Sequence, residues 1–172
     1  MTARVLVVDD IEANRRLLQA KLEAQYYTVM LAENGIEALS MVERSEPDII
    51  LLDVMMPGMD GYEVCRRLKE NPATAHIPVV MVTALNDAED RVRGLDVGAE
   101  DFLTKPVDDF ALMARMGAIT RYNAVASELR QRQASGLRAG IDGDESLNVK
   151  DQPARLFVVD DNPRSSSRVA ET

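Results

Sequence analysis

Short apolar runs alternate with stretches of helical period along most of the chain. The runs are Val5–Val8, Thr28–Leu31, Ile49–Leu52, Val79–Val82 and Phe102–Leu103. The first, third and fourth are apolar at every position, which is typical of strands buried on both faces of a parallel sheet. Because helical stretches separate the runs, the order predicts an α/β fold: a doubly wound, five-stranded parallel sheet flanked by helices.

Between these runs, apolar residues recur at spacings of three and four, as expected for helices with one buried face. The apolar sets are Leu17, Leu18 and Leu22; Ala38, Leu39 and Val42; and Val64, Cys65 and Leu68. A weaker pair, Val92 and Leu95, marks a fourth helix. We expect these side chains to face the sheet.

The last helix follows Asp108-Asp109, and its apolar positions continue from Leu112 to Leu129 without a stop signal. The pattern fits either an extended helix that meets another helix or a long helix with a frayed end.

Residues 134–153 are rich in Gly and acidic residues, which predicts a linker. Residues 154–161 then repeat the pattern of residues 3–10, an apolar strand followed by two Asp. We therefore divide the chain into a domain at 1–122, a helical extension at 123–133, a linker at 134–153, and the truncated start of a second copy at 154–172.

The composition places the chain among folded, acidic proteins. Hydrophobic residues make up 46% and charged residues 28%, and 20 Lys and Arg against 29 Asp and Glu give a net charge of −9. This charge argues against binding to nucleic acid or to an anionic membrane, whereas metal cations fit it. A single cysteine, Cys65, rules out an intramolecular disulfide framework. With no signal peptide and no apolar run long enough for a bilayer span, we expect a cytoplasmic protein.

Chemically capable side chains gather where the predicted strands end. They are Asp9, Asp10, Asp53, Thr83 and Lys105. In an open α/β sheet the carboxyl ends of the strands border the ligand crevice, so these groups should converge. Adjacent carboxylates repel, and a hard divalent cation such as Mg²⁺ together with Lys105 would compensate them. An ammonium and a hydroxyl beside them suit a phosphoryl group, for which an Asp carboxylate such as Asp53 is a competent nucleophile.

Each of these residues also has a purely structural interpretation. An Asp pair after a strand is most often a helix N-cap, a Thr after a strand often caps a helix, and a Lys before Pro is usually a solvated turn residue. The joint placement of the set at four strand ends of one sheet favours the functional interpretation.

Four segments carry a resemblance to a known family. They are Val7–Asp10, Asp53–Gly61, Val82–Ala84 and Thr104–Pro106. Over about residues 3–122 the chain resembles the receiver domain of bacterial two-component response regulators. The resemblance implies a flavodoxin-like receiver fold in which Asp53 accepts a phosphoryl group from a phosphohistidine. The donor would be a sensor histidine kinase or a phosphotransfer protein.

The resemblance also implies a metal site. The carboxylates of Asp9, Asp10 and Asp53, together with the backbone carbonyl of Met55, would hold Mg²⁺, with Mn²⁺ as an alternative ion.

Further roles follow from the same family pattern. Lys105 would pair with the phosphoryl oxygens, and Thr83 would hydrogen-bond the phosphoryl group. Phe102 matches the aromatic switch position that turns inward with Thr83. Because a Phe has no hydroxyl, such a switch would rest on packing alone.

The long last helix and the restart at residue 154 look like the N-terminal part of PleD-type regulators, in which tandem receivers precede a diguanylate cyclase domain. This implies control of cyclic-di-GMP synthesis and a homodimer that forms on phosphorylation. The chain itself is expected to be no enzyme but a phosphoacceptor that assists its own phosphorylation and dephosphorylation. Two alternatives remain: a receiver-like interaction module that works without phosphorylation, and a metal-assisted phosphatase with an Asp nucleophile.

Overall fold

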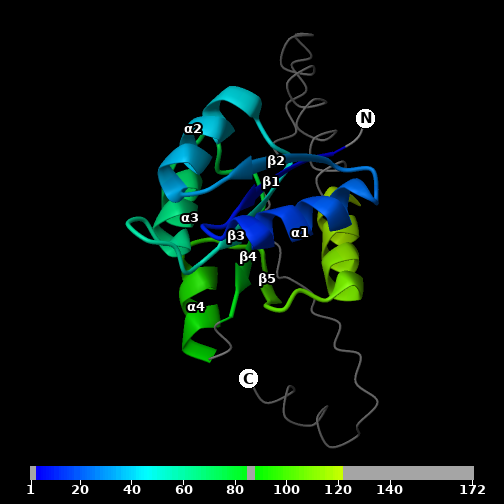
Figure 1. The fold of residues 1–172 in the computed structure, drawn as a ribbon. Helices are drawn as coiled ribbons and strands as arrows, with labels where there is room; N and C mark the ends of the chain where they lie inside the picture. Colours follow the sequence, from blue (N-terminus) through cyan, green and yellow to red (C-terminus); the bar gives the residue numbers. More distant parts are fainter. Residues whose placement is uncertain (1–2, 85–87, 122–172) are drawn as a thin grey trace, which may run out of the picture. The chain divides into compact units, whose positions relative to one another are not determined.

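The structure, a computed structural model, describes residues 3–84 and 88–121. These residues contain one sheet of five parallel strands in the order β2-β1-β3-β4-β5 (Figure 1). The strands are β1 (Arg4–Val8), β2 (Thr28–Ala32), β3 (Ile49–Asp53), β4 (Val79–Thr83) and β5 (Asp101–Thr104). The predicted fold class is therefore confirmed. Because the chain winds outward in one direction from β1 to β2 and in the other from β3 onward, the crevice is expected beyond the carboxyl ends of β1 and β3.

Helices cover both faces of the sheet (Figure 1). They are α1 (Glu12–Glu23), α2 (Gly35–Ser45), α3 (Gly61–Glu70), α4 (Ala88–Asp96) and a helix over 109–121. In Figure 1, α2, α3 and α4 lie on one side of the sheet, and α1 and the 109–121 helix lie on the other. None of the helices in the described ranges is both long and apolar enough to cross a membrane.

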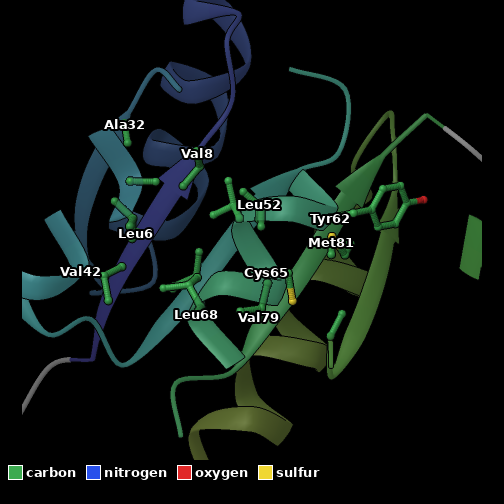
Figure 2. Packing of buried hydrophobic residues seen from close by; sticks show 14 of the residues in the cluster. Leu6, Val8, Ala32, Val42, Leu52, Tyr62, Cys65, Leu68, Val79 and Met81 are labelled. Carbon is green, nitrogen blue, oxygen red and sulfur yellow. The ribbon is translucent and has the colours of Figure 1, made fainter. Parts of the chain in front are cut away.

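Two apolar layers fill the space between the sheet and its helices, because successive side chains of a strand point to opposite faces. One layer joins Leu6, Val8, Ile50, Leu52, Val79 and Met81 to α2 and α3, and Figure 2 shows part of it around Cys65 and Leu68. The other joins Val5, Val7, Ile49, Leu51, Val80 and Val82 to α1 and the 109–121 helix. The central strands are thus buried on both faces, as their unbroken apolar runs predict.

The predicted buried faces of α2 and α3 are confirmed, but that of α1 is wrong at one position. Leu18 and Leu22 are buried, whereas Leu17 is 55% exposed. Leu17 lies about 100° around the helix axis from Leu18, and the buried stripe of α1 includes Leu18 and Leu22 but does not extend to Leu17.

The pair that marks α4 also points the other way. Val92 and Leu95 are 56% and 57% exposed, so the expectation that they face the sheet is wrong. Helix α4 instead approaches its neighbours through Gly94, at which an added Cβ would lie 2.4 Å from the Phe102 ring. A glycine gives no signal in a hydrophobicity pattern, and the periodicity therefore misses this face.

The helix over 109–121 starts beside Asp108, whose carboxylate accepts a hydrogen bond from the backbone N–H of Ala111 at 2.8 Å. Leu112 and Met116 are fully buried, as their spacing predicts. The predicted helical extension at 123–133, the linker at 134–153 and the second copy at 154–172 lie outside the described residues.

Candidate functional site

The carboxyl ends of four strands bring the predicted polar set together. Asp9 directly follows β1 and Lys105 directly follows β5, while Asp53 and Thr83 are the last residues of β3 and β4. The register pairs Asp53 with Val82, and it pairs Thr83 with Thr104, so these ends lie at one edge of the sheet. Asp9, Asp53 and Thr83 are buried, with exposures of 1%, 3% and 4%.

Lys105 reaches across this edge to two carboxylates. Its Nζ lies 2.6 Å from Asp9 Oδ2 and 2.8 Å from Asp53 Oδ2. The ammonium therefore bridges two buried carboxylates that come from different strands. Charge-assisted hydrogen bonds of this length are among the stronger ones in proteins. The peptide bond between Lys105 and Pro106 is cis.

The environment shifts the pKa of both partners. Burial raises the pKa of Asp53 above its usual range, and the nearby charge of Asp9 adds to this, while the bond to Lys105 opposes it. Burial alone would lower the pKa of Lys105, but the hydrogen bonds to Asp53 and Asp9 outweigh it and leave that pKa raised. Lys105 therefore remains an ammonium at neutral pH, and its charge favours the ionised form of Asp53.

The acidic residues of the site form one cluster of oxygen donors. One carboxylate oxygen each from Asp9, Asp10 and Asp53 lies within 4.8 Å of the others, and Asp10 is exposed. Met55 borders the cluster, because its backbone N–H donates to Asp53 Oδ1 at 3.3 Å. A set made only of oxygen donors, open to solvent on one side, fits Mg²⁺, which prefers such ligands and keeps several waters.

The loop that follows β3 holds the backbone of Asp53 in place. The N–H of Gly61 donates to the carbonyl of Val54 at 3.0 Å, and an added Cβ on Gly61 would lie 2.3 Å from the carbonyl oxygen of Asp53. Asp60 caps α3 by accepting from the N–H of Glu63 at 2.8 Å. These residues shape the loop, and a side chain at Gly61 would displace the strand end that carries Asp53.

Thr83 and Phe102 occupy neighbouring strands. The backbone carbonyl of Thr83 accepts from the N–H of Lys105 at 2.8 Å, which ties the end of β4 to the lysine. Phe102 is half-buried and packs against the apolar layer under α3, with its ring tip at Gly94. Tyr62 lies beside the same glycine, and its hydroxyl donates to the backbone carbonyl of Asp90 at 3.2 Å.

Sequence reasoning missed two residues of α1 that touch Asp9. Asn14 donates to both carboxylate oxygens at 3.1 Å, and Arg15 Nη1 donates to the Asp9 backbone carbonyl at 2.6 Å. The family resemblance implies that exposed residues of the first helix, such as Asn14, Arg15 and Leu18, set the choice of partner, but Leu18 is buried and the other two contact Asp9. The available signal was their place in the first turn of α1, because helical side chains lean toward the N-terminus and so over the preceding loop.

Comparison with known proteins agrees with this geometry. Residues 5–117 match the family model of the response regulator receiver domain. Over 170 residues the chain is 57% identical to the response regulator PleD of Caulobacter vibrioides, which covers 99% of this chain and 37% of PleD. It is also 42% identical over 118 residues to the DNA-binding dual master transcriptional regulator RpaA of Synechocystis, covering 69% of this chain and 49% of that protein. The chain thus spans about a third to a half of these relatives' lengths.

Solved structures share the fold. A putative response regulator from Chloroflexus aurantiacus superposes with a TM-score of 0.67 at 34% identity and covers 69% of this chain and 98% of that one. The chemotaxis protein CheY4 of Vibrio cholerae superposes with a TM-score of 0.66 at 30% identity, covering 69% of this chain and 99% of that one.

Proposed function

The chain belongs to the family of response regulator receiver domains, and from this premise we propose that Asp53 is the phosphoacceptor of a two-component pathway. The matched segment is a receiver domain and not an enzyme, and receivers of this family act with sensor histidine kinases. One observation carries the assignment to Asp53: its buried carboxylate lies 2.8 Å from the Lys105 ammonium at the carboxyl end of the sheet. We propose a phosphohistidine of a sensor kinase or of a phosphotransfer protein as the donor, and the cytoplasm as the compartment.

In the proposed reaction, a carboxylate oxygen of Asp53 attacks the phosphorus of the phosphohistidine. A P–O bond forms and the P–N bond breaks, so that its electron pair stays on the imidazole nitrogen, which takes up a proton from solvent. Lys105 already lies beside Asp53 and pairs with the oxygens of the incoming phosphoryl group. Water later hydrolyses the acyl phosphate, which releases phosphate and restores the carboxylate.

The acidic cluster is proposed to hold Mg²⁺, with Mn²⁺ as an alternative. Asp9, Asp10, Asp53 and the backbone carbonyl of Met55 are the proposed binding residues, supported by the oxygen atoms within 4.8 Å of one another. When bound, the ion would neutralise charge on the phosphoryl oxygens. Thr83 is proposed to hydrogen-bond the phosphoryl group.

The proposed output is a change in packing and association. Phe102 has no hydroxyl, so its part in a switch with Thr83 rests on the fit of its ring against Gly94. A phosphorylation-dependent homodimer and a role in control of cyclic-di-GMP synthesis are proposed from the resemblance to PleD-type regulators, with which the 57% identity to PleD agrees. We also propose the division at 1–122, 123–133, 134–153 and 154–172, which rests on the sequence pattern.

The phosphoacceptor is tested by incubating the full chain with radiolabelled acetyl phosphate and Mg²⁺. Asp53→Asn keeps the shape of the side chain and removes the nucleophile, and we expect it to lose the label. Asp48→Asn is the matched control, because Asp48 is exposed and lies at the opposite end of β3. Labelling of Asp53→Asn at the wild-type level would exclude Asp53. A wild-type protein that takes up no label would favour the alternative, an interaction module that works without phosphorylation.

Association is tested by light scattering with Mg²⁺ and beryllofluoride, an anion that mimics an acyl phosphate. A shift from monomer to dimer would support the phosphorylation-driven homodimer. Binding of the anion without a change in mass would argue against it.

A further inference from the structure

The Asp9 carboxylate is surrounded by hydrogen-bond donors. Its Oδ1 accepts from the backbone N–H of Ile11 at 2.9 Å, and its Oδ2 accepts from Lys105 at 2.6 Å. The side-chain amide of Asn14 lies 3.1 Å from both oxygens. An ionised carboxylate offers about four lone-pair sites, so these four contacts leave Asp9 without a spare acceptor.

The side-chain nitrogen of Asn14 is equidistant from the two Asp9 carboxylate oxygens. A cation that both oxygens of one carboxylate coordinate would lie at this same point. We call this side of the carboxylate, between its two oxygens, the chelating edge. The assignment of nitrogen rather than oxygen to this atom follows from chemistry, since an amide oxygen there would face an acceptor-only carboxylate. Asn14 thus covers the chelating edge of Asp9.

The other acidic residues of the cluster are less constrained. The Asp10 side chain is exposed, and within the described ranges no hydrogen bond to its carboxylate is found. Among the described residues, Asp53 accepts hydrogen bonds from Lys105 and from the Met55 N–H. Asp10 and Asp53 can therefore bind a cation directly, whereas Asp9 must first give up a donor.

This difference bears on which cation the cluster accepts. Mg²⁺ requires octahedral geometry and retains waters, so it needs few carboxylate oxygens from the protein. Ca²⁺ takes six to eight oxygens and often grips a carboxylate through both of its oxygens. A cluster in which one carboxylate cannot chelate is better suited to the smaller ion.

We propose that Asn14 is a positioning residue that sets the cation preference of the site, because its amide covers the chelating edge of Asp9 and so disfavours Ca²⁺ relative to Mg²⁺. The inference rests on the proposed function, since it assumes that the acidic cluster binds a divalent cation. Arg15 supports the arrangement by holding the Asp9 backbone carbonyl at 2.6 Å. Loss of Asn14 alone should then expose the edge between the two Asp9 oxygens, while Ile11 and Lys105 still bind those oxygens and the loop stays in place.

The test measures cation binding and not phosphorylation. Free Mn²⁺ is followed by electron paramagnetic resonance as it is titrated with the full chain, and Mg²⁺ and Ca²⁺ are then added as competitors to give both dissociation constants. In Asn14→Ala the edge of Asp9 is open, and we expect the preference for Mg²⁺ over Ca²⁺ to fall about tenfold, the usual size of an effect from a residue that orients a metal ligand.

Two further variants separate this role from general damage. Asn14→Leu keeps the bulk and removes the donor, so the edge stays covered and the Mg²⁺ preference should remain at the wild-type value. Gln19→Ala is the matched control, since it also removes an amide from α1, but one that bonds Glu23 at 2.8 Å and Arg16 at 3.2 Å instead of the site. It should behave as wild type.

A preference in Asn14→Ala that stays within about twofold of wild type would overturn the inference. So would an equal loss of preference in Asn14→Leu, because the effect would then come from the lost hydrogen bond and not from the uncovered edge. Either result would leave the proposed function intact if the wild type still binds Mg²⁺ and takes up label. A wild type that binds no divalent cation would overturn both.

Discussion

The contact between Phe102 and α4 depends on the absence of a side chain at Gly94. A Cβ at this position would lie 2.4 Å from Cζ and 2.6 Å from Cε1 of the ring. Carbon atoms in favourable contact are about 3.5–4.0 Å apart, so the ring of Phe102 would have to move back by roughly 1 Å or leave the space beside Gly94. Gly94→Ala is therefore a perturbation of one methyl group aimed at the proposed switch residue.

Two opposing terms set the size of the effect. Overpacking in a well-filled site typically costs about 1–3 kcal/mol. Replacing a helical glycine by alanine gains roughly 0.5–1 kcal/mol, because alanine loses less conformational freedom on folding. In the wild-type background Gly94→Ala should therefore lower the free energy of unfolding by about 0–2.5 kcal/mol. In a Phe102→Ala background the space beside Gly94 is empty, so Gly94→Ala should raise the free energy of unfolding by about 0.5–1 kcal/mol.

The assay is a double-mutant cycle, with urea unfolding followed by far-UV circular dichroism because the chain has no Trp. We expect the effect of Gly94→Ala on the free energy of unfolding to change sign between the wild-type and the Phe102→Ala background. The coupling free energy between the two positions should be about 1–3 kcal/mol. If Gly94→Ala has the same effect with and without the Phe102 ring, then the two positions do not share this contact and the reasoning is refuted. Gln25→Ala, exposed just beyond α1, serves as the baseline for a neutral change.

Three further predictions use the same unfolding measurements. Gly61→Ala should lower the free energy of unfolding by about 3 kcal/mol or more and slow phosphoryl uptake, because its Cβ would lie 2.3 Å from the Asp53 carbonyl oxygen. The control is Gly117→Ala, whose Cβ would meet a flexible side chain at 3.4 Å and which should be neutral or slightly stabilising. Leu18→Ala should cost about 2–4 kcal/mol and Leu17→Ala under about 0.5 kcal/mol, and similar losses for both would contradict the assigned face of α1. Because burial raises the pKa of Asp53, folding favours its protonated form, and the cost of ionising it appears as pH rises through that raised pKa. Asp53→Asn should therefore stabilise the fold near neutral pH, and the gain should vanish below about pH 3.9, the ordinary pKa of Asp; a gain that persists there would contradict this cause.

Much of the fold was predictable because buried parallel strands leave an unmistakable pattern. Ile49–Leu52 and Val79–Val82 are apolar at every position, and both segments are strands buried on both faces. Their carboxyl ends follow from chain direction alone, so the convergence of Asp53 and Thr83 at one edge could also be expected. The resemblance to the receiver family rests on those same strand ends.

The side-chain contacts at the site were harder to predict. Asn14 reads as a polar surface residue in a helical pattern, yet it contacts Asp9 because α1 starts directly over the loop that holds Asp9. Gly94 gives no signal at all, although it makes room for Phe102. The pattern of α4 pointed instead to Val92 and Leu95, which are exposed.

The sequence by itself thus determined where the strands lie, that the central ones are buried on both faces, and which residues end them. Hydrophobic periodicity and chain direction are local properties, so they can be read along the chain. Only the tertiary structure decided that Lys105 bridges Asp9 and Asp53, that Asn14 covers one of these carboxylates, and which face of α4 is covered. These contacts join residues from separate elements. Their distances depend on how helices pack against the sheet, which the spacing of residues along one element does not contain.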